Sequence, residues 1–159
     1  MTENKDKITI PPQNIDAEIS VLGALLLDKD AIIRVSDSLS PDDFYKDIHG
    51  LIYSAAISLF EHREPIDVIT LTNKLEELKI LDKIGGGSYI ATLASSVPSA
   101  ANIVHYAKIV SEKAILRRLI RASNEINSLA LNEEQEIPVV LDKAEQAIFQ
   151  VSQKHELQL

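Results

Sequence analysis

The feature that most constrains the fold of this sequence is a long stretch without glycine or proline, from about Asn102 to Leu131. Glycine and proline are the residues that weaken or break helices most strongly. Their absence predicts one continuous helix, about 45 Å long at a rise of 1.5 Å per residue. Such a helix is longer than a compact domain of this size needs.

The spacing of apolar residues predicts that this helix pairs with a second one. After the polar segment 132–137, Pro138 can open another helix, in which Ala144 and Ala147 are small enough for close approach. Seam residues three and four apart are Leu116, Leu119, Ser123, Ile126 and Ala130 in the first helix and Leu141, Ala144, Ile148 and Val151 in the second. Two such seams joined by a short loop are typical of an antiparallel helical hairpin.

The hairpin also carries apolar residues that its own seam does not cover. These are Tyr106, Ile109, Ile115 and Ile120. Surface of this kind usually marks a contact with a partner or with a second copy of the chain. The alternative is that it folds back on the rest of the protein.

The remainder of the sequence predicts shorter helices. Asn14 and Asp67 are good N-caps, Asp28 can cap a short helix, and residues 40–43 carry a further start signal, ahead of a helical stretch from Tyr45 to Phe60. Another helix follows from about Ser88 to Val97. The fold class is therefore all-α. We expect a flexible tail at 1–10, a compact multi-helix globular domain at 11–100, a long antiparallel helical hairpin at 101–154 and the start of a linker at 155–159.

Composition excludes several classes of protein. The chain has no cysteine, which removes disulfides, thiolate chemistry and the usual zinc sites. No apolar run approaches the ~18–20 residues that span a bilayer, and the polar first residues are not a signal peptide. The net charge of −8 disfavours tight DNA binding by this chain alone. We therefore expect a soluble, cytoplasmic protein without a membrane partner.

The run Gly85-Gly86-Gly87-Ser88 raises the question of a phosphate-binding loop. A Walker A loop needs Lys and then Ser or Thr directly after its last glycine, whereas Ser88 and Tyr89 stand there. We favour a helix C-cap followed by a new helix that starts at Ser88. A phosphate at that helix N-terminus stays open as an alternative.

Other candidate chemistry is weak. None of the four histidines, His49, His62, His105 and His155, has a second metal ligand at helical spacing, so we expect them at the helix surface or in an interface. We predict no catalytic, metal or cofactor residue. The basic cluster Lys113, Arg117, Arg118 and Arg121 is interpreted as a solvated helix face rather than a contact with nucleic acid or an acidic partner.

Several blocks in fixed order resemble one known family. They are PPQNIDAEISVLGALLLD (11–28), LSPDDFYKDIHGLIYSAAISL (39–59), EPIDVITLTNKL (64–75), IGGGSYIATLASSVPSAANIVHYAKIV (84–110) and EKAILRRLI (112–120). From Pro11 to Val151 the chain closely resembles the N-terminal region of bacterial replicative DNA helicases of the DnaB family. The resemblance implies a non-enzymatic collar domain whose hairpins pair between subunits, in a dimer, a trimer of dimers or a hexamer.

The resemblance also implies partners and a division of labour. Primase docks on the collar through its C-terminal domain, and a helicase loader is a further expected partner. ATP and Mg²⁺ belong to a C-terminal motor that this sequence lacks, and that motor unwinds duplex DNA 5′ to 3′ at the replication fork. DNA is expected to be bound only through the full-length ring.

Family positions and hairpin surface together predict the interface residues. In the family, an aromatic residue after the glycine run and apolar residues on the first hairpin helix tune primase binding, and Tyr89, Ile120 and Ile126 match those positions. The complete set of candidates is Tyr89, Tyr106, Ile109, Ile115, Arg117, Ile120, Arg121 and Ile126. The alternative function is an independent acidic adaptor or weak nucleic-acid-binding domain that uses the Lys113–Arg121 patch. An enzyme built on His49 has only residue types in its favour.

Overall fold

A computed structural model describes residues 10–157 of the 159-residue chain. The described part contains six α-helices, two short 3₁₀ helices and no strand, which confirms the all-α prediction. The helices are α1 (Ile15–Leu27), η1 (Ala31–Arg34), η2 (Pro41–Asp43), α2 (Asp47–Glu61), α3 (Val68–Glu77), α4 (Gly86–Ala94), α5 (Ile103–Leu131) and α6 (Ile137–Leu157). The predicted tail 1–10 lies, except for Ile10, outside the described residues, as do residues 158–159 of the predicted linker.

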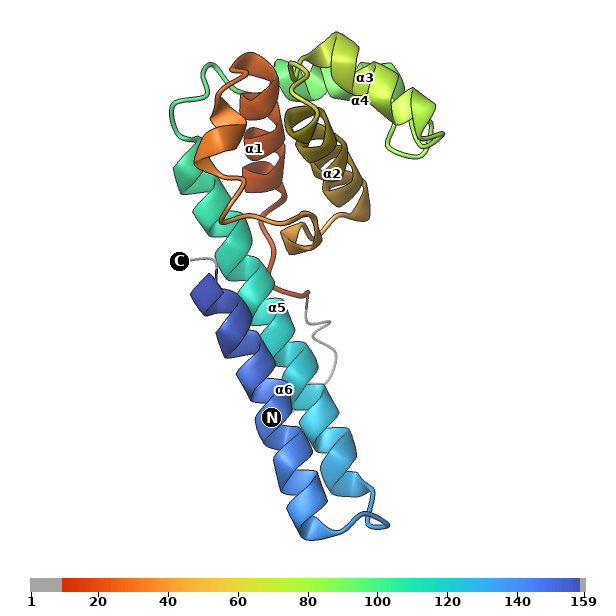
Figure 1. Ribbon diagram of the computed structural model, residues 1–159, viewed down its shortest axis with the longest axis vertical. Coiled ribbons are helices and arrows are strands. Elements are labelled where there is room, and N and C mark those ends of the chain that lie inside the picture. Colours follow the sequence, from red (N-terminus) through yellow and green to blue (C-terminus); the bar gives the residue numbers. More distant parts are fainter. Residues whose placement is uncertain (1–9, 158–159) are drawn as a thin grey trace, which may run out of the picture.

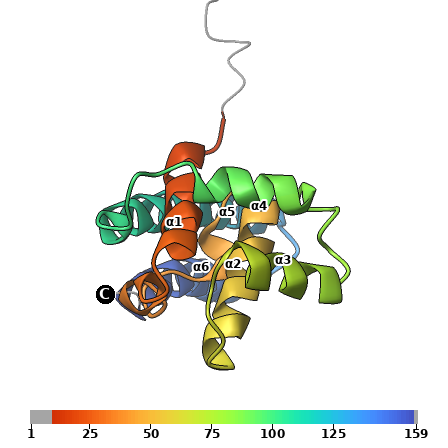
Figure 2. The ribbon, with the colours of Figure 1, turned by 90° about the horizontal axis from the view of Figure 1, so that it is seen from above.

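Helices α1 to α4 and the first part of α5 form a head, residues 15–114 (Figure 1). Helix α1 contacts α2, α4 and α5, and α3 contacts α2 and α4, so the short helices surround one core (Figure 2). Two of the predicted caps start these helices. The Asn14 side chain accepts a hydrogen bond from the Ala17 N–H at 2.9 Å. Asp67 and Thr70 form a reciprocal capping box at the start of α3.

Helix α5 belongs to both parts of the molecule. Ile103, Ala107 and Val110 are buried in the core of the head, where α5 packs against α1. Beyond the head, α5 runs antiparallel to α6, as predicted for the long helix and the hairpin (Figure 1). The division of the chain at residue 100 stays a prediction.

Several predicted boundaries are wrong by a few residues. Helix α4 begins at Gly86 rather than Ser88 and ends at Ala94 rather than Val97. Gly85 and Gly86 both have positive φ angles, of 108° and 77°, which lets the chain reverse tightly enough for the helix to start early. The short element after Asp28 is a 3₁₀ helix whose N-cap position is Asp30, and α2 begins at Asp47 rather than Tyr45.

Gly23 marks the closest approach of two head helices. A Cβ atom built at this position would lie 2.5 Å from the Leu93 carbonyl oxygen of α4. Only glycine therefore allows α1 and α4 to pack at their observed distance.

Candidate interaction site

The hairpin is held together along a seam that differs from the predicted one. Ala122 and Ala147 are each only 5% exposed, and half-buried residues continue this stripe along both helices. These are Ile115, Ile126 and Leu129 on α5 and Val140, Ala144 and Val151 on α6. Of the predicted seam, Ile126, Ala144 and Val151 are half-buried, whereas Leu116, Leu119, Ser123, Ala130, Leu141 and Ile148 are exposed.

The reason for the shift is the size of the seam residues. Alanine side chains at the crossing allow two helices to approach closely, and the interaxial distance depends on the side chains at the contact. The hairpin places Ala122 and Ala147 inside, so the larger leucine and isoleucine side chains beside them turn outward.

These larger side chains form an exposed apolar surface that we call the hairpin face. Three of its residues, Leu116, Leu141 and Ile148, follow a seam residue by one position, a rotation of about 100° around the helix. Leu119 and Ile120 lie three and four residues after Leu116, on the same side of α5. In an antiparallel pair of right-handed helices, that rotation leads to the same side of the pair from either helix. The hairpin face consists of Leu116 (44% exposed), Leu119 (41%), Ile120 (45%), Leu141 (58%) and Ile148 (43%).

The predicted interface residues of the hairpin separate into two groups. Tyr106 and Ile109 are half-buried and pack against the core of the head, so this part of the predicted apolar surface does fold back on the chain. Ile120 lies on the hairpin face. Ile115 and Ile126 are half-buried along the seam.

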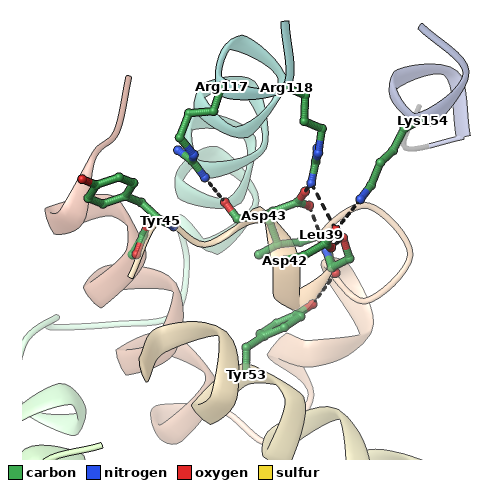
Figure 3. Close-up of polar contacts among 10 residues, drawn as sticks. Leu39, Asp42, Asp43, Tyr45, Tyr53, Arg117, Arg118 and Lys154 are labelled. Atoms are coloured by element: carbon green, nitrogen blue, oxygen red, sulfur yellow. Dashed lines mark hydrogen bonds and ion pairs between the residues drawn. The ribbon is translucent and has the colours of Figure 1, made fainter. Parts of the chain in front are cut away.

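A polar clamp joins the hairpin to the head (Figure 3). Arg117 donates hydrogen bonds at 2.8 Å to the backbone carbonyls of Pro12 and Asp43, and its guanidinium lies 5.4 Å from the centre of the Tyr45 ring. Arg118 forms an ion pair with the buried Asp43 carboxylate and a longer one, at 3.6 Å, with Asp42.

The second helix of the hairpin reaches the same clamp. The Lys154 ammonium lies 2.5 Å from the Asp42 carboxylate, so α6 is tied to η2 near its C-terminal end (Figure 3). Burial raises the pKa of Asp42, but hydrogen bonds from Lys154 and Ser40 and the charges of Lys154 and Arg118 outweigh it and lower the pKa to about 2. Burial lowers the pKa of Arg117, against the opposing charges of Glu18 and Asp43.

The clamp corrects our interpretation of the basic cluster as one solvated face. Arg118 is only 12% exposed in its side chain, and Arg117 is half-buried. Both guanidinium groups are engaged with the head, whereas Arg121 is exposed and Lys113 is half-buried. The cluster is thus divided between internal contacts and the surface.

Tyr89 is anchored by a buried polar network that sequence reasoning missed. His49 is completely buried, which contradicts the expected surface or interface position. Its Nδ1 lies 2.8 Å from Glu18 Oε1, and its Nε2 lies 2.5 Å from the Tyr89 hydroxyl. Glu18 also accepts the backbone N–H groups of Tyr45 and Lys46. Burial, followed by the Glu18 charge, raises the pKa of Tyr89.

This network links three helices of the head through one histidine. Glu18 belongs to α1, His49 to α2 and Tyr89 to α4. A buried carboxylate is costly without partners, and Glu18 has three, in the His49 ring and the backbone N–H groups of Tyr45 and Lys46. Because Glu18 and His49 are 31 positions apart, no local spacing in the sequence identifies this pair.

The glycine run does not fit a phosphate-binding loop. The Gly85 N–H donates to the Asp82 carbonyl and the Gly86 N–H to the Leu81 carbonyl, so both amides are used within the turn. Within residues 10–157, no group of three or more His, Asp or Glu side chains is placed to hold a metal ion. No helix in this range is long and apolar enough to cross a membrane.

A groove of about 860 Å³ runs between α5 and the head. Its basic side chains are Lys83, Arg117, Arg118 and Arg121, and its acids are Asp42 and Asp47. Its apolar walls are Pro11, Pro41, Phe44, Tyr45, Leu51 and Ile120. Ile120 therefore belongs both to this groove and to the hairpin face.

Comparison with known proteins identifies related sequences over most of the chain. Residues 10–112 match the family described as "DnaB-like helicase N terminal domain". The chain is 46% identical over 145 residues to the "Replicative DNA helicase DnaC" of Bacillus subtilis (strain 168) and to the "Replicative DNA helicase DnaB" of Geobacillus stearothermophilus. Each match covers 91% of this chain and 32% of the relative, so the chain spans about a third of their length.

Solved structures share the fold. The N-terminal domain of DnaB helicase from Mycobacterium tuberculosis matches with a TM-score of 0.85 and 42% identity, over 89% of this chain and 99% of that one. A second structure is titled "The Structure Of A DnaB-Like Replicative Helicase And Its Interactions With Primase". It matches with a TM-score of 0.71 over 87% of this chain and 31% of that one, but at 24% identity it is evidence for the fold alone.

Proposed function

Because this chain belongs to the family of DnaB-like helicase N-terminal domains, we propose that it is the collar and interaction domain of a hexameric replicative DNA helicase. In this proposal the collar occupies residues 11–154, is not itself an enzyme, and brings subunits together and docks primase. ATP, Mg²⁺ and 5′ to 3′ unwinding belong to a C-terminal motor outside this sequence, in the cytoplasm at the replication fork. A helicase loader is a further proposed partner.

The observation that carries this proposal is the hairpin face. Its five large side chains are each about half exposed, although they lie next to a packed seam. Completing the burial of one such side chain contributes about 1 kcal/mol, half of the ~2 kcal/mol for a full one. Two copies that pair through this face would bury five such side chains each and gain about 10 kcal/mol in total. The costs of association that oppose this gain are about 4–15 kcal/mol.

The alternative of a nucleic-acid-binding domain has lost its main support. Arg117 and Arg118 make contacts within the chain, which leaves Arg121 as the exposed arginine of the predicted patch. One exposed arginine in this patch, beside the half-buried Lys113, does not make the electrostatic surface that DNA binding needs on a chain of net charge −8.

Self-association is tested by analytical ultracentrifugation at tens of micromolar. We expect the wild-type chain to form dimers or larger assemblies, and Leu119→Asp with Ile148→Asp to leave a folded monomer. The matched control is Ile69→Asp on α3, because Ile69 is 78% exposed on the head and away from the hairpin. A strictly monomeric wild type, or equal loss of association in the control, would refute the proposed interface.

Primase docking is tested separately, by titration with the C-terminal domain of the cognate primase. We propose Tyr89, Ile120 and Ile126 as the principal contacts and Arg117 and Arg121 as secondary ones. Tyr89→Phe removes the hydroxyl that bonds His49 but keeps the ring, so it separates ring contact from hydrogen bonding. No measurable binding by the wild-type chain would argue against this part of the proposal.

A further inference from the structure

The buried network around His49 leads to two half-buried side chains, and each of them is a proposed primase contact. Tyr89 lies at one end, on α4, and Arg117 lies at the other, on α5. We propose that Glu18 and His49 are positioning residues, which hold these two side chains together as one partner-binding site. This inference rests on the proposed docking of primase and adds the reason why contacts on two different helices act together.

The first half of the connection runs from Tyr89 to Glu18. The Tyr89 hydroxyl lies 2.5 Å from His49 Nε2, and the two rings are parallel, with an interplanar angle of 4°. On the other side of the imidazole, Nδ1 lies 2.8 Å from Glu18 Oε1. The position of the Tyr89 side chain on α4 is therefore tied to a carboxylate on α1.

The second half runs from Glu18 to Arg117 through residues 43–46, at the passage from η2 to α2. Glu18 accepts two consecutive backbone N–H groups of this stretch, the first from Tyr45 at 2.7 Å. Arg117 contacts the same stretch twice (Figure 3). It donates to the Asp43 carbonyl at 2.8 Å, and its guanidinium lies 5.4 Å from the centre of the Tyr45 ring. Glu18 therefore holds the backbone against which Arg117 is placed.

The pair of Glu18 and His49 supplies geometry that packing alone does not. Their side chains are 2% and 0% exposed, beside a core of apolar residues. Replacing a buried polar pair by apolar residues of similar volume is often neutral or stabilising, so stability does not require this pair. Hydrogen bonds have preferred distances and directions, whereas apolar burial is non-directional. The network thus fixes where the two outer side chains lie.

Both positioning residues are too deeply buried to contact a partner themselves. Substitutions at His49 can therefore change partner binding only through the groups that it holds. In His49→Asn, the shorter amide can keep the hydrogen bond to Glu18 but does not reach Tyr89. In His49→Gln, the longer amide can keep the bond to Tyr89 and loses the bond to Glu18. The two substitutions therefore cut the connection at different bonds.

Hydrogen exchange of backbone amides tests the connection without any partner, in the monomeric double variant described for ultracentrifugation. Tyr89→Phe should speed the exchange of the Tyr45 and Lys46 amides about fivefold, the factor expected for the loss of one hydrogen bond. The control is Tyr53→Phe, which also removes a buried tyrosine hydroxyl, bonded at 2.8 Å to the Leu39 carbonyl. It should leave the two amides unchanged. Unchanged exchange in Tyr89→Phe, or an equal increase in the control, would overturn the inference.

A double-mutant cycle tests whether the two ends act together on the partner. The C-terminal domain of the cognate primase is titrated into the natural chain, Tyr89→Phe, Arg117→Lys and the chain with both substitutions. We expect the combined effect on the dissociation constant to differ by at least about twofold from the product of the single effects. With His49→Asn or His49→Gln added to all four chains, this difference should disappear.

Two outcomes of the cycle would contradict the inference. One is independent effects of the Tyr89 and Arg117 substitutions in the natural chain, and the other is a coupling that persists in both His49 backgrounds. If the natural chain does not bind the primase domain, the proposed docking fails. The exchange measurement then still decides whether Glu18 and His49 connect the two ends.

Discussion

Arg118 and Arg121 lie one turn apart on α5, yet their removal should have very different effects on stability. The Arg118 guanidinium is paired with the fully buried Asp43 carboxylate, whereas Arg121 is exposed. Removing one partner of a buried ion pair costs about 3–5 kcal/mol, because the other charge stays buried. Exposed side chains usually change the free energy of unfolding by less than about 0.5 kcal/mol.

Two details place the Arg118→Ala effect at or below the low end of that range. Asp43 keeps a hydrogen bond from the Ser40 N–H at 2.9 Å. The Arg118 Nη1 is buried without a hydrogen-bond partner among the described residues, so the native pair is not fully satisfied. We therefore expect a loss of about 2–3 kcal/mol. For a domain of this size that loss lowers Tm by about 4–12 °C.

The assay is urea and thermal unfolding followed by circular dichroism. Both substitutions are made in the Leu119→Asp, Ile148→Asp background, because self-association would add apparent stability. Arg121→Ala is the matched control and should leave Tm nearly unchanged. Equal effects of the two substitutions, or a loss below about 0.5 kcal/mol for Arg118→Ala, would refute the assignment of Arg118 to a buried pair.

Three further predictions concern the head and the clamp. In a urea titration, His49→Ala should lower the free energy of unfolding by about 3 kcal/mol, because it removes a buried hydrogen-bonding partner and leaves a cavity. The control is His62→Ala at an exposed position, which should change the free energy of unfolding by less than about 0.5 kcal/mol. Gly23→Ala should cost about 1–3 kcal/mol in thermal unfolding, because its Cβ would meet a backbone oxygen, whereas Gly87→Ala meets only ordinary contact at 3.6 Å and should be tolerated. The Asp42 carboxylate has its pKa lowered from 3.8 to about 2, so its stabilisation is complete above pH 3.8 and is lost as pH falls through about 2. Because this side chain is 65% exposed, the change is below about 1 kcal/mol, and it should disappear from acid titrations of Asp42→Asn.

Much of the fold follows from signals that are local in the sequence. The absence of glycine and proline predicted α5, and the N-caps Asn14 and Asp67 predicted the starts of α1 and α3. A helix and its cap depend on residues within three or four positions of one another. For this reason the helices were predicted better than the contacts between them.

The seam and the clamp could not be predicted in the same way. A pattern of large apolar residues favoured a seam through Leu116 and Leu119, but the structure packs the hairpin through alanines. Arg118 and Asp43 are 75 positions apart, and Glu18 and His49 are 31 positions apart. The sequence offers no spacing rule for such pairs, so burial of the arginine and of the histidine appears only in the folded chain.

The continuity of α5 has a mechanical consequence. Helix α5 begins inside the head and continues without interruption to Leu131, at the far end of the hairpin. The ion pair between Lys154 and Asp42 connects α6 to the head. From Ala114 to Leu131 this lever arm is about 25 Å long. Because this arm is one uninterrupted helix, we expect a force applied at its far end to move the arm and the head together.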